Sequence, residues 1–306
     1  DTVVVGESEE VWPRVVRDFV KGKMERLYRC EQFPDLARSP IPRWDFLNPK
    51  NYWCFTIQSG RGCPHDCNFC SVRVFNGVRY RHRRIDQIVG EVELLRSMDR
   101  NKWLMLADDN LLAAPKFARE LLAGLSPLKL RRWICQASLN RLKDEGLLQL
   151  LHRAGCRLVF VGFESVSEST LAAMSKGLVN KVEEYKTAVK RIQDHGIAVL
   201  GSFVLGSDTD DPSIFAKTIA FIREAKLPFS MINILTPPPG TALAGLLERC
   251  KRILHREWEL YDGENVCFAP QLLSSEELKS GHDEVLREVY DYEQLFGRLC
   301  AEENRP

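Results

Sequence analysis

The stretch WCFTIQSGRGCPHDCNFCSV (residues 53–72) joins the two patterns that decide the fold. Its first part, residues 53–59, is apolar and aromatic, as expected for a β-strand buried on both faces. The second part places Cys63, Cys67 and Cys70 within eight residues, among two glycines and a proline that disfavour a regular helix. The sequence therefore predicts a buried strand that ends in a loop carrying three thiol groups.

The strand pattern recurs along the chain, and helical patterns lie between its copies. The predicted strands cover residues 53–59, 103–108, 132–138, 156–164, 198–206 and 229–236. Helical segments, with apolar residues three and four apart, cover residues 85–98, 114–125, 143–155, 181–196 and 211–226. Several of these end at a glycine (Gly124, Gly155 and Gly196), which is a common left-handed helix cap.

This alternation predicts an α/β fold with parallel strands and right-handed crossovers. Because no glycine fingerprint follows the first strand, we expect a partial (β/α)6 barrel of the TIM type rather than an open doubly wound sheet. The barrel is expected over residues 51–243. Residues 1–50 form an N-terminal segment and linker with one short strand and one helix, and residues 244–306 form a helical C-terminal region.

The composition indicates a globular protein without a strong overall charge. The chain has 306 residues, 44% hydrophobic and 28% charged, and its net charge is +1; such a balance gives no reason to expect nucleic acid as a partner. No apolar run approaches the roughly 18 residues of a transmembrane segment, and the start has no signal-peptide pattern. Seven further cysteines are scattered, as in proteins of a reducing compartment. We expect a cytoplasmic protein, peripheral to the membrane if its substrate is a lipid.

Three thiolates at this spacing suggest a metal centre with one open position. Thiolates suit zinc and iron–sulfur clusters. A structural zinc takes four protein ligands, no second cysteine pair follows, and His65 and Cys54 are poorly placed as the fourth. A cubane cluster with one iron left open fits the count of three. The loop would lie at the C-terminal face of the barrel, where such folds place their chemistry.

The Cx3Cx2C spacing, with Phe69 before the last cysteine, resembles the signature of the radical S-adenosylmethionine (SAM) superfamily. The resemblance implies a [4Fe–4S] cluster held by Cys63, Cys67 and Cys70, with SAM chelated by the open iron. It also implies reductive cleavage of SAM to methionine and a 5′-deoxyadenosyl radical, which abstracts hydrogen from a substrate. Phe69 is then expected to contact the adenine of SAM.

Polar residues end the later strands, where the same ligand would lie. Asp108, Asp109 and Asn110 stand where many members of the superfamily carry a glycine-rich motif that meets the amino group of SAM. Capping of the following segment by Asp109 or Asn110 is the alternative. Glu164 ends a buried strand, where a carboxylate needs a partner, and the resemblance assigns it to the ribose or the amino group of SAM.

Gln136 and Ser202, on two other predicted strands, are further candidates for contact with SAM. For both, an ordinary hydrogen bond within the sheet is the alternative. No residue is assigned to a bond-making step.

The flanks narrow the resemblance to one subgroup. The stretch DTVVVGESEEVWPRVVRDF (residues 1–19) resembles the closing strand and helix of the cobalamin-binding domain that precedes the barrel in many members. The stretch YDGENVCFAPQLLSSEEL (residues 261–278) resembles their C-terminal region, and the methylase of hopanoid lipids belongs to this group. A doubly wound domain needs about 100 residues or more, far more than precede the linker here. The chain has no Asp-x-His-x-x-Gly motif, so cobalamin is implied only by the neighbouring sequence.

The resemblance therefore implies a methyltransferase that uses cobalamin to methylate an unactivated carbon of a small-molecule or lipid-like substrate. The alternatives are a radical SAM cyclase or rearrangement enzyme without methyl transfer and, less favoured, an iron–sulfur electron carrier. A carrier would ligate all four irons, which three cysteines do not do. A methylthiotransferase is disfavoured because no further group of three cysteines exists for an auxiliary cluster. An electron donor such as flavodoxin or ferredoxin is the expected partner.

Overall fold

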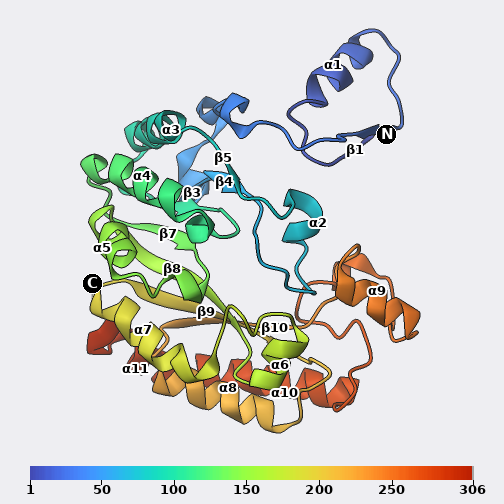
Figure 1. The fold of residues 1–306 in the computed structure, drawn as a ribbon, viewed down its shortest axis with the longest axis vertical. Helices are drawn as coiled ribbons and strands as arrows, with labels where there is room; N and C mark the ends of the chain where they lie inside the picture. Colours follow the sequence, from blue (N-terminus) through green and yellow to red (C-terminus); the bar gives the residue numbers. More distant parts are fainter. Residues whose placement is uncertain (305–306) are drawn as a thin grey trace.

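The computed structural model describes residues 1–304 and is built on a six-stranded parallel sheet. The order of the strands is β10-β9-β8-β7-β6-β3 (Figure 1). They are β3 (Cys54–Ile57), β6 (Trp103–Leu106), β7 (Trp133–Gln136), β8 (Cys156–Glu164), β9 (Ala198–Leu205) and β10 (Phe229–Ile234). The connecting helices are α3 (Ile85–Met98), α4 (Pro115–Leu125), α5 (Glu145–Arg153), α6 (Glu168–Ala173), α7 (Tyr185–Asp194) and α8 (Ser213–Glu224).

This arrangement confirms the predicted partial barrel. Each of the six predicted strands is present, and each pairs in parallel with its neighbour along the chain. Five of them end earlier than predicted, as in β3, which stops at Ile57 rather than at residue 59. Asp108, Asp109 and Asn110 therefore lie in the loop that follows β6, whereas Glu164 is the last residue of β8, and all four lie at the C-terminal edge of the sheet.

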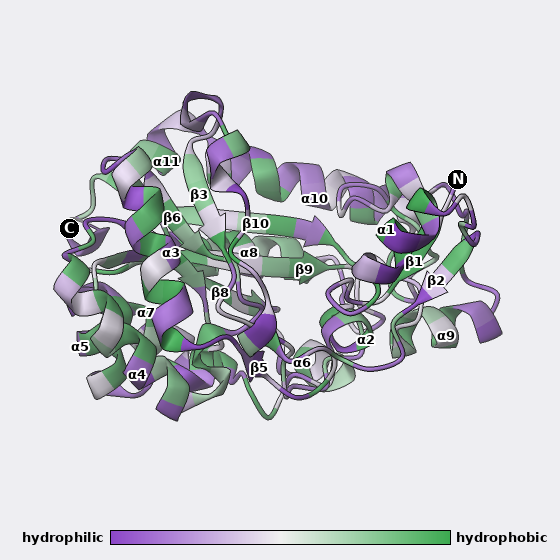
Figure 2. Ribbon diagram, turned by 90° about the horizontal axis from the view of Figure 1, so that it is seen from above, coloured by the Kyte–Doolittle hydropathy of each residue, from purple (hydrophilic) through white to green (hydrophobic). Residues whose placement is uncertain are grey.

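The core lies between the sheet and the helices that cover it. Figure 2 shows hydrophobic residues on the strands and hydrophilic residues on the outer faces of the helices. Four aromatic residues, Phe163, Tyr185, Phe203 and Phe221, pack around one point between β8, β9, α7 and α8. The rings of Phe163 and Phe203 stack with centroids 5.5 Å apart. These contacts fix β8 and β9, the two longest strands.

The sheet does not close into a full barrel, and the C-terminal helices cover its β10 edge. Tyr290, at the end of α10 (Ser275–Tyr290), donates to the Ser230 carbonyl at 2.5 Å and accepts from the Ser230 N–H at 3.2 Å. His282 lies 3.1 Å from the Ile232 carbonyl. An exposed strand edge can pair with another chain. At this edge, Tyr290 and His282 form hydrogen bonds with the backbone groups of β10 that such pairing would use.

The N-terminal residues form a small unit of their own, set apart from the sheet (Figure 1). It consists of β1 (Val3–Val5) and β2 (Leu27–Arg29), which are parallel, and α1 (Trp12–Val20) between them. The strand and helix expected near the start are thus present. Five further strands and α-helices were not anticipated: β2, the antiparallel pair β4 (Gly60–Arg61) and β5 (Arg81–His82), α2 (Val72–Asn76) and the short α6. The chain ends in α9 (Ala242–Arg249), α10 and α11 (Tyr292–Leu299).

Two of the three predicted glycine caps are confirmed. Gly155 and Gly196 adopt φ values of +90° and +69° after α5 and α7. The prediction for Gly124 is wrong, because this glycine lies inside α4, which continues to Leu125 and then into a 3-10 turn. Among residues 1–304, no helix combines the length and the apolar character needed to cross a bilayer.

Candidate functional site

The three cysteines of the loop after β3 and β4 line one cavity of about 180 Å³. Asp109, Asn110, Gln136 and Glu164, which follow or end β6, β7 and β8, line the same cavity. Because the strands are parallel, their C-terminal ends meet at one edge of the sheet. The structure therefore brings together seven of the ten residues predicted for the site.

Gly62 allows the cysteine loop to turn away from the sheet. Its φ is +93°, in the region that favours glycine, and a Cβ there would lie 2.4 Å from the carbonyl oxygen of Arg79. The loop is also held from outside, because the backbone N–H of Asn68 donates to the Met174 carbonyl at 3.3 Å and its side-chain amide donates to the Ala173 carbonyl at 2.7 Å. The carbonyl of Asn68 accepts from Leu243 at the start of α9 at 3.0 Å. The loop is thus fixed between α6 and α9.

Asp109 and Asn110 both line the cavity and support its wall. Asp109 accepts from the Gly62 N–H at 3.3 Å and from the side-chain amide of Asn76 at 3.0 Å. Asn110 donates to Ser138 Oγ at 3.1 Å, accepts from the Ser138 N–H at 3.2 Å, and has its amide nitrogen 3.9 Å from Cys63 Sγ. The cap that was considered for the following 3-10 turn at residues 111–113 is not formed by the Asn110 side chain.

Asp108 is fully buried below the cavity and does not line it. It accepts hydrogen bonds from Ser59 N–H at 3.1 Å, Ser59 Oγ at 2.9 Å, Tyr80 Oη at 3.1 Å and the Gly60 N–H. Burial raises the pKa of Asp108 to about 6, although these hydrogen bonds act in the opposite direction. In this position Asp108 joins β6 to the corner between β3 and β4.

Phe69 and Ser202 also lie outside the residues that line the cavity. Phe69 packs against a separate apolar cluster that includes Met174 and Leu243. Ser202 is buried on β9, directly opposite Gly162 of β8.

Glu164 has a left-handed backbone conformation although it is not a glycine, and its side chain forms a buried ion pair. Its φ is +66°, and the register of β8 with β9 shifts between Gly162 and Glu164. Its Oε1 lies 2.9 Å from Nζ of Lys176, and both side chains are 11% exposed. The side chain folds back over Gly162, where a Cβ would lie 2.2 Å from Glu164 Oε1. Unusual backbone conformations of residues with side chains are concentrated at functional sites.

Lys176 supplies a fixed positive charge to the cavity. Burial alone would lower its pKa, but the charge of Glu164 and the nearby Cys67 raise the pKa of Lys176 above its usual value. It therefore remains an ammonium throughout the physiological pH range. Sequence reasoning missed Lys176, because its pairing with Glu164 depends on how the short α6 folds back on β8, and no periodic pattern marks that position.

His65 is a second residue that sequence reasoning did not assign. It lines the cavity, and its Nε2 is buried with no hydrogen-bond partner among the residues that the structure describes. Burial lowers the pKa of His65, and the charge of Lys176 lowers it further. A neutral imidazole with an unpartnered nitrogen indicates space for a polar ligand at this point.

The residues at this cavity fit an iron–sulfur cluster better than a single metal ion. No three His, Cys, Asp or Glu side chains among residues 1–304 converge closely enough to enclose one ion. A cubane is larger than an ion, so its ligands stand further apart, and thiolates are its usual ligands. Burial raises the pKa of Cys67 to about 11 and also raises that of Cys70. Both thiols therefore stay protonated near neutral pH even beside Lys176, and iron would supply the further positive charge that favours their thiolates.

The size of the cavity and its polar lining also fit part of a nucleoside-linked amino acid. Ligand sites that enclose a whole molecule usually measure about 300 Å³ or more. The cavity of about 180 Å³ is therefore large enough for a cluster or for the polar end of a ligand, but not for a cluster and a whole ligand together. Lys176 can pair with a carboxylate, whereas Glu164 and Asp109 can accept from an ammonium.

Comparisons with known proteins agree with this geometry. The family model described as the radical SAM superfamily matches residues 57–234, more than half of the chain. Bacteriochlorophyllide d C-12(1)-methyltransferase of Chlorobaculum tepidum is 31% identical over 305 residues, which cover 97% of this chain and 66% of that protein. Hopanoid C-2 methylase of Rhodopseudomonas palustris is 28% identical over 264 residues, which cover 83% of this chain and 50% of that protein.

A solved structure shows the same fold. The cobalamin-dependent SAM radical enzyme OxsB, with aqua-cobalamin and SAM bound, superposes with a TM-score of 0.69 at 13% identity, over 92% of this chain and 49% of that one. At this identity the likeness establishes the fold alone. The chain spans between about half and two thirds of the length of these proteins.

Proposed function

Because this chain belongs to the radical SAM superfamily, we propose that Cys63, Cys67 and Cys70 hold a [4Fe–4S] cluster and that the polar residues beside them bind SAM. The superfamily uses this cluster to pass one electron to SAM, which yields methionine and a 5′-deoxyadenosyl radical. The observation that carries the proposal is the convergence of three thiols with Asn110 and Glu164 in one cavity.

The chain's own residues bind and orient the ligand in this proposal. Lys176 and Glu164 form a fixed pair of opposite charges, which matches a ligand with one carboxylate and one ammonium. Gln136 offers a side-chain amide for which no hydrogen bond is formed within residues 1–304. Asp109 and Asn110 keep the wall of the cavity rigid through Gly62 and Ser138. Asp108 and Phe69 support the loop from behind rather than touching the ligand.

The reaction that best fits the relatives is methylation of an unactivated carbon with cobalamin as methyl carrier. The two curated relatives are named as methyltransferases, and OxsB is named as cobalamin-dependent. Residues 1–50 would then be the end of a cobalamin-binding domain. Support comes from α1, which packs through Val15 on Tyr28, while Trp12, Phe19 and Val20 of the same helix are 56%, 68% and 78% exposed. Several large apolar side chains exposed on one short helix suit a surface that packs against a further part of a protein.

A radical SAM cyclase or rearrangement enzyme is the second candidate. The observation that favours it is a relative from Synechocystis named anaerobic magnesium-protoporphyrin IX monomethyl ester cyclase, which is 27% identical over 226 residues. The substrate in either case is a small molecule, which includes lipid-like compounds. An acidic electron-transfer protein such as flavodoxin or ferredoxin would supply the electron. No disulfide joins any cysteines among residues 1–304, as is usual in a reducing compartment, and we place the protein in the cytoplasm as part of this proposal.

The test is an anaerobic assay of the reconstituted protein. Iron and sulfide are added, the protein is reduced with dithionite, and 5′-deoxyadenosine and S-adenosylhomocysteine are measured after addition of SAM, with and without cobalamin. Cys63→Ala, Cys67→Ala and Cys70→Ala should each lose iron and both products, whereas Cys250→Ala, at an exposed position, should keep them.

The products decide between the candidates. Formation of both compounds with cobalamin present supports the methyltransferase, and 5′-deoxyadenosine alone supports the cyclase or rearrangement enzyme. A protein with an intact cluster that forms neither product contradicts the proposal, as does a Cys70→Ala variant with full iron content.

A further inference from the structure

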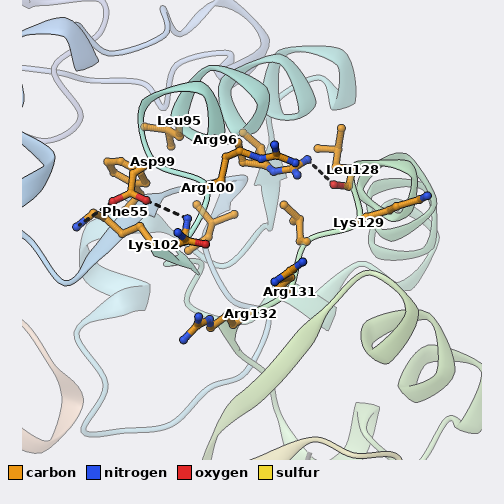
Figure 3. A pocket seen from close by; sticks show the side chains of 14 residues that line it. Phe55, Leu95, Arg96, Asp99, Arg100, Lys102, Leu128, Lys129, Arg131 and Arg132 are labelled. Atoms are coloured by element: carbon orange, nitrogen blue, oxygen red, sulfur yellow. Dashed lines mark hydrogen bonds and ion pairs between the residues drawn. The ribbon is translucent and has the colours of Figure 1, made fainter.

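A second cavity, of about 560 Å³, lies at the opposite end of the sheet from the cysteines, and Figure 3 shows the side chains that line it. Its walls come from the end of α3, from the loop before β6 and from the loop before β7. These segments precede their strands, so they lie at the N-terminal edge of the parallel sheet. Since β6 is four residues long, about 13 Å of strand separates this cavity from the site described above.

The cavity is strongly cationic although the whole chain has a net charge of only +1. Among residues 1–304, Asp99 is the only acidic residue that lines it, and its carboxylate lies 3.9 Å from Nζ of Lys102. Six basic residues line it: Arg96, Arg100, Lys102, Lys129, Arg131 and Arg132. Such a local excess of one sign attracts ligands of the opposite charge.

Half of these cations have no partner among residues 1–304. Arg96 donates to the Leu128 carbonyl, and Lys102 donates to the Tyr52 carbonyl at 2.5 Å. Arg100, Arg131 and Lys129 make no side-chain hydrogen bond or ion pair within the described chain. Figure 3 shows that Lys129 extends away from the other basic side chains, whereas the arginines gather around the cavity.

Apolar side chains form the floor beneath these charges. Phe55, Leu95 and Leu104 line the cavity and are almost fully buried. Lys129 has a φ of +49°, a left-handed conformation that is costly for a residue with a side chain. The turn is followed directly by Arg131 and Arg132, which line the cavity. The cavity thus combines a cationic rim with an apolar base.

We propose that this cavity binds a phosphorylated amphiphile, in which a phosphate dianion is joined to an apolar body. The planar guanidinium groups of Arg100 and Arg131 match phosphate oxygens, and the Phe55 side of the cavity takes the apolar part. The ligand binds too far from the cysteines to touch the reacting atoms. The same chemistry is found in a free phosphate ester and in the headgroup region of an anionic phospholipid, and the experiment separates these two sources. The proposal does not depend on the proposed function.

The experiment measures binding of 1-naphthyl phosphate by calorimetry and binding of vesicles by sedimentation. The vesicles are made of phosphatidylglycerol or of phosphatidylcholine, and 1-naphthol serves as the ligand without the phosphate. The test variant is Arg100→Glu with Arg131→Glu. The matched control is Lys116→Glu with Lys217→Glu, which changes the net charge equally on exposed helix positions outside the cavity.

Binding by wild type and control, with a loss of about ten- to hundredfold in the test variant, is the expected result. Binding of 1-naphthyl phosphate by the wild-type protein identifies a free phosphate ester as the class of ligand. Binding of phosphatidylglycerol vesicles without binding of 1-naphthyl phosphate identifies the lipid. Three results overturn the proposal: no binding of either probe, equal binding of 1-naphthol, or an equal loss in test and control variants. Because charge reversal could affect folding, Arg100→Gln with Arg131→Gln provides a milder second variant with the same expected direction.

Discussion

At the scale of single residues, Gly162 decides whether the buried ion pair of the site can form. The side chain of Glu164 lies where a Cβ of residue 162 would be, at 2.2 Å, and it reaches Lys176 from there. Removing one member of a buried pair leaves an uncompensated charge, whereas a methyl group at residue 162 would displace the pair and keep both charges. The glycine therefore offers a way to test the geometry without changing the chemistry.

Gly162→Ala should weaken SAM binding by about tenfold or more and lower the free energy of unfolding by about 1–3 kcal/mol, the usual effect of overpacking. Iron content should remain at the wild-type level, because the cysteine loop is untouched. Equilibrium dialysis with SAM, iron analysis and denaturant unfolding measure the three quantities. Gly90→Ala, in α3 where a Cβ meets no atom within 4 Å, is the control. Unchanged SAM affinity in Gly162→Ala would show that the pair does not contribute to the site.

Asp108 gives a second residue-level prediction, which concerns pH. The folded state holds the proton of Asp108 up to about pH 6, whereas the unfolded chain releases it near the ordinary value of 3.8. Between these values the folded state binds more protons, so the free energy of unfolding falls as pH rises. The difference corresponds to about 3 kcal/mol. The stabilisation that protonated Asp108 contributes is complete below about pH 4 and is lost as the pH rises above about 6.

Denaturant unfolding of wild type and Asp108→Asn between pH 4 and 7 measures this effect. The variant should show a smaller decrease in stability with rising pH, because residue 108 no longer titrates. Asp66→Asn, whose carboxylate is 75% exposed, should keep the wild-type dependence. Parallel curves for wild type and Asp108→Asn would contradict the assignment.

At the scale of elements, the parallel strands and the main helices could be predicted because their apolar periods are regular. The residues 85–98 and 156–164 match α3 and β8 from end to end. The pairing of β4 with β5 could not be predicted, since each strand has two residues and the hairpin depends on Gly60 and Tyr80 lying in contact. Asp108 illustrates a second limit. Its position after a strand is visible in the sequence, so we expected it at the ligand. The direction of its side chain, toward Ser59 and Tyr80, depends on the fold.

The cysteine loop supplies the prediction at this scale. Gly62→Ala would force a Cβ to within 2.4 Å of the Arg79 carbonyl and would move the start of the loop. We expect iron incorporation to fall severalfold, while the far-ultraviolet circular dichroism of the barrel is unchanged. Gly22→Ala is the control. Gly22 also has a positive φ, of +64°, but a Cβ there would meet no atom within 4 Å, so this variant should incorporate iron at the wild-type level. Full iron content in Gly62→Ala would mean that the loop tolerates the displacement.

At the scale of the whole molecule, a small set of ion pairs connects the N-terminal unit to the barrel. The Glu7 side chain, 7% exposed, pairs with Arg81 of β5 and with Arg61 of β4 at 2.6 Å, and Glu9 pairs with Arg61 at 2.7 Å. Arg61 directly precedes Gly62, so the contact from the N-terminal unit ends at the base of the cysteine loop. These ion pairs therefore connect the N-terminal unit directly to the residue that precedes the cysteine loop.

Glu7→Gln tests this connection. The substitution removes the negative charge that two partly buried guanidinium groups share, and a lost hydrogen bond to a charged group is worth about 1.5–3 kcal/mol. Amide hydrogen exchange in residues 3–29 should become about tenfold faster or more, because local opening of this unit becomes easier, whereas exchange in β8 should not change. Glu10→Gln removes a weaker contact to Arg38, 3.9 Å long and exposed on both sides, and should leave both regions unaffected. Equal protection of residues 3–29 in wild type and Glu7→Gln would show that the apolar contacts of Val15 and Tyr28, rather than the ion pairs, hold this unit in place.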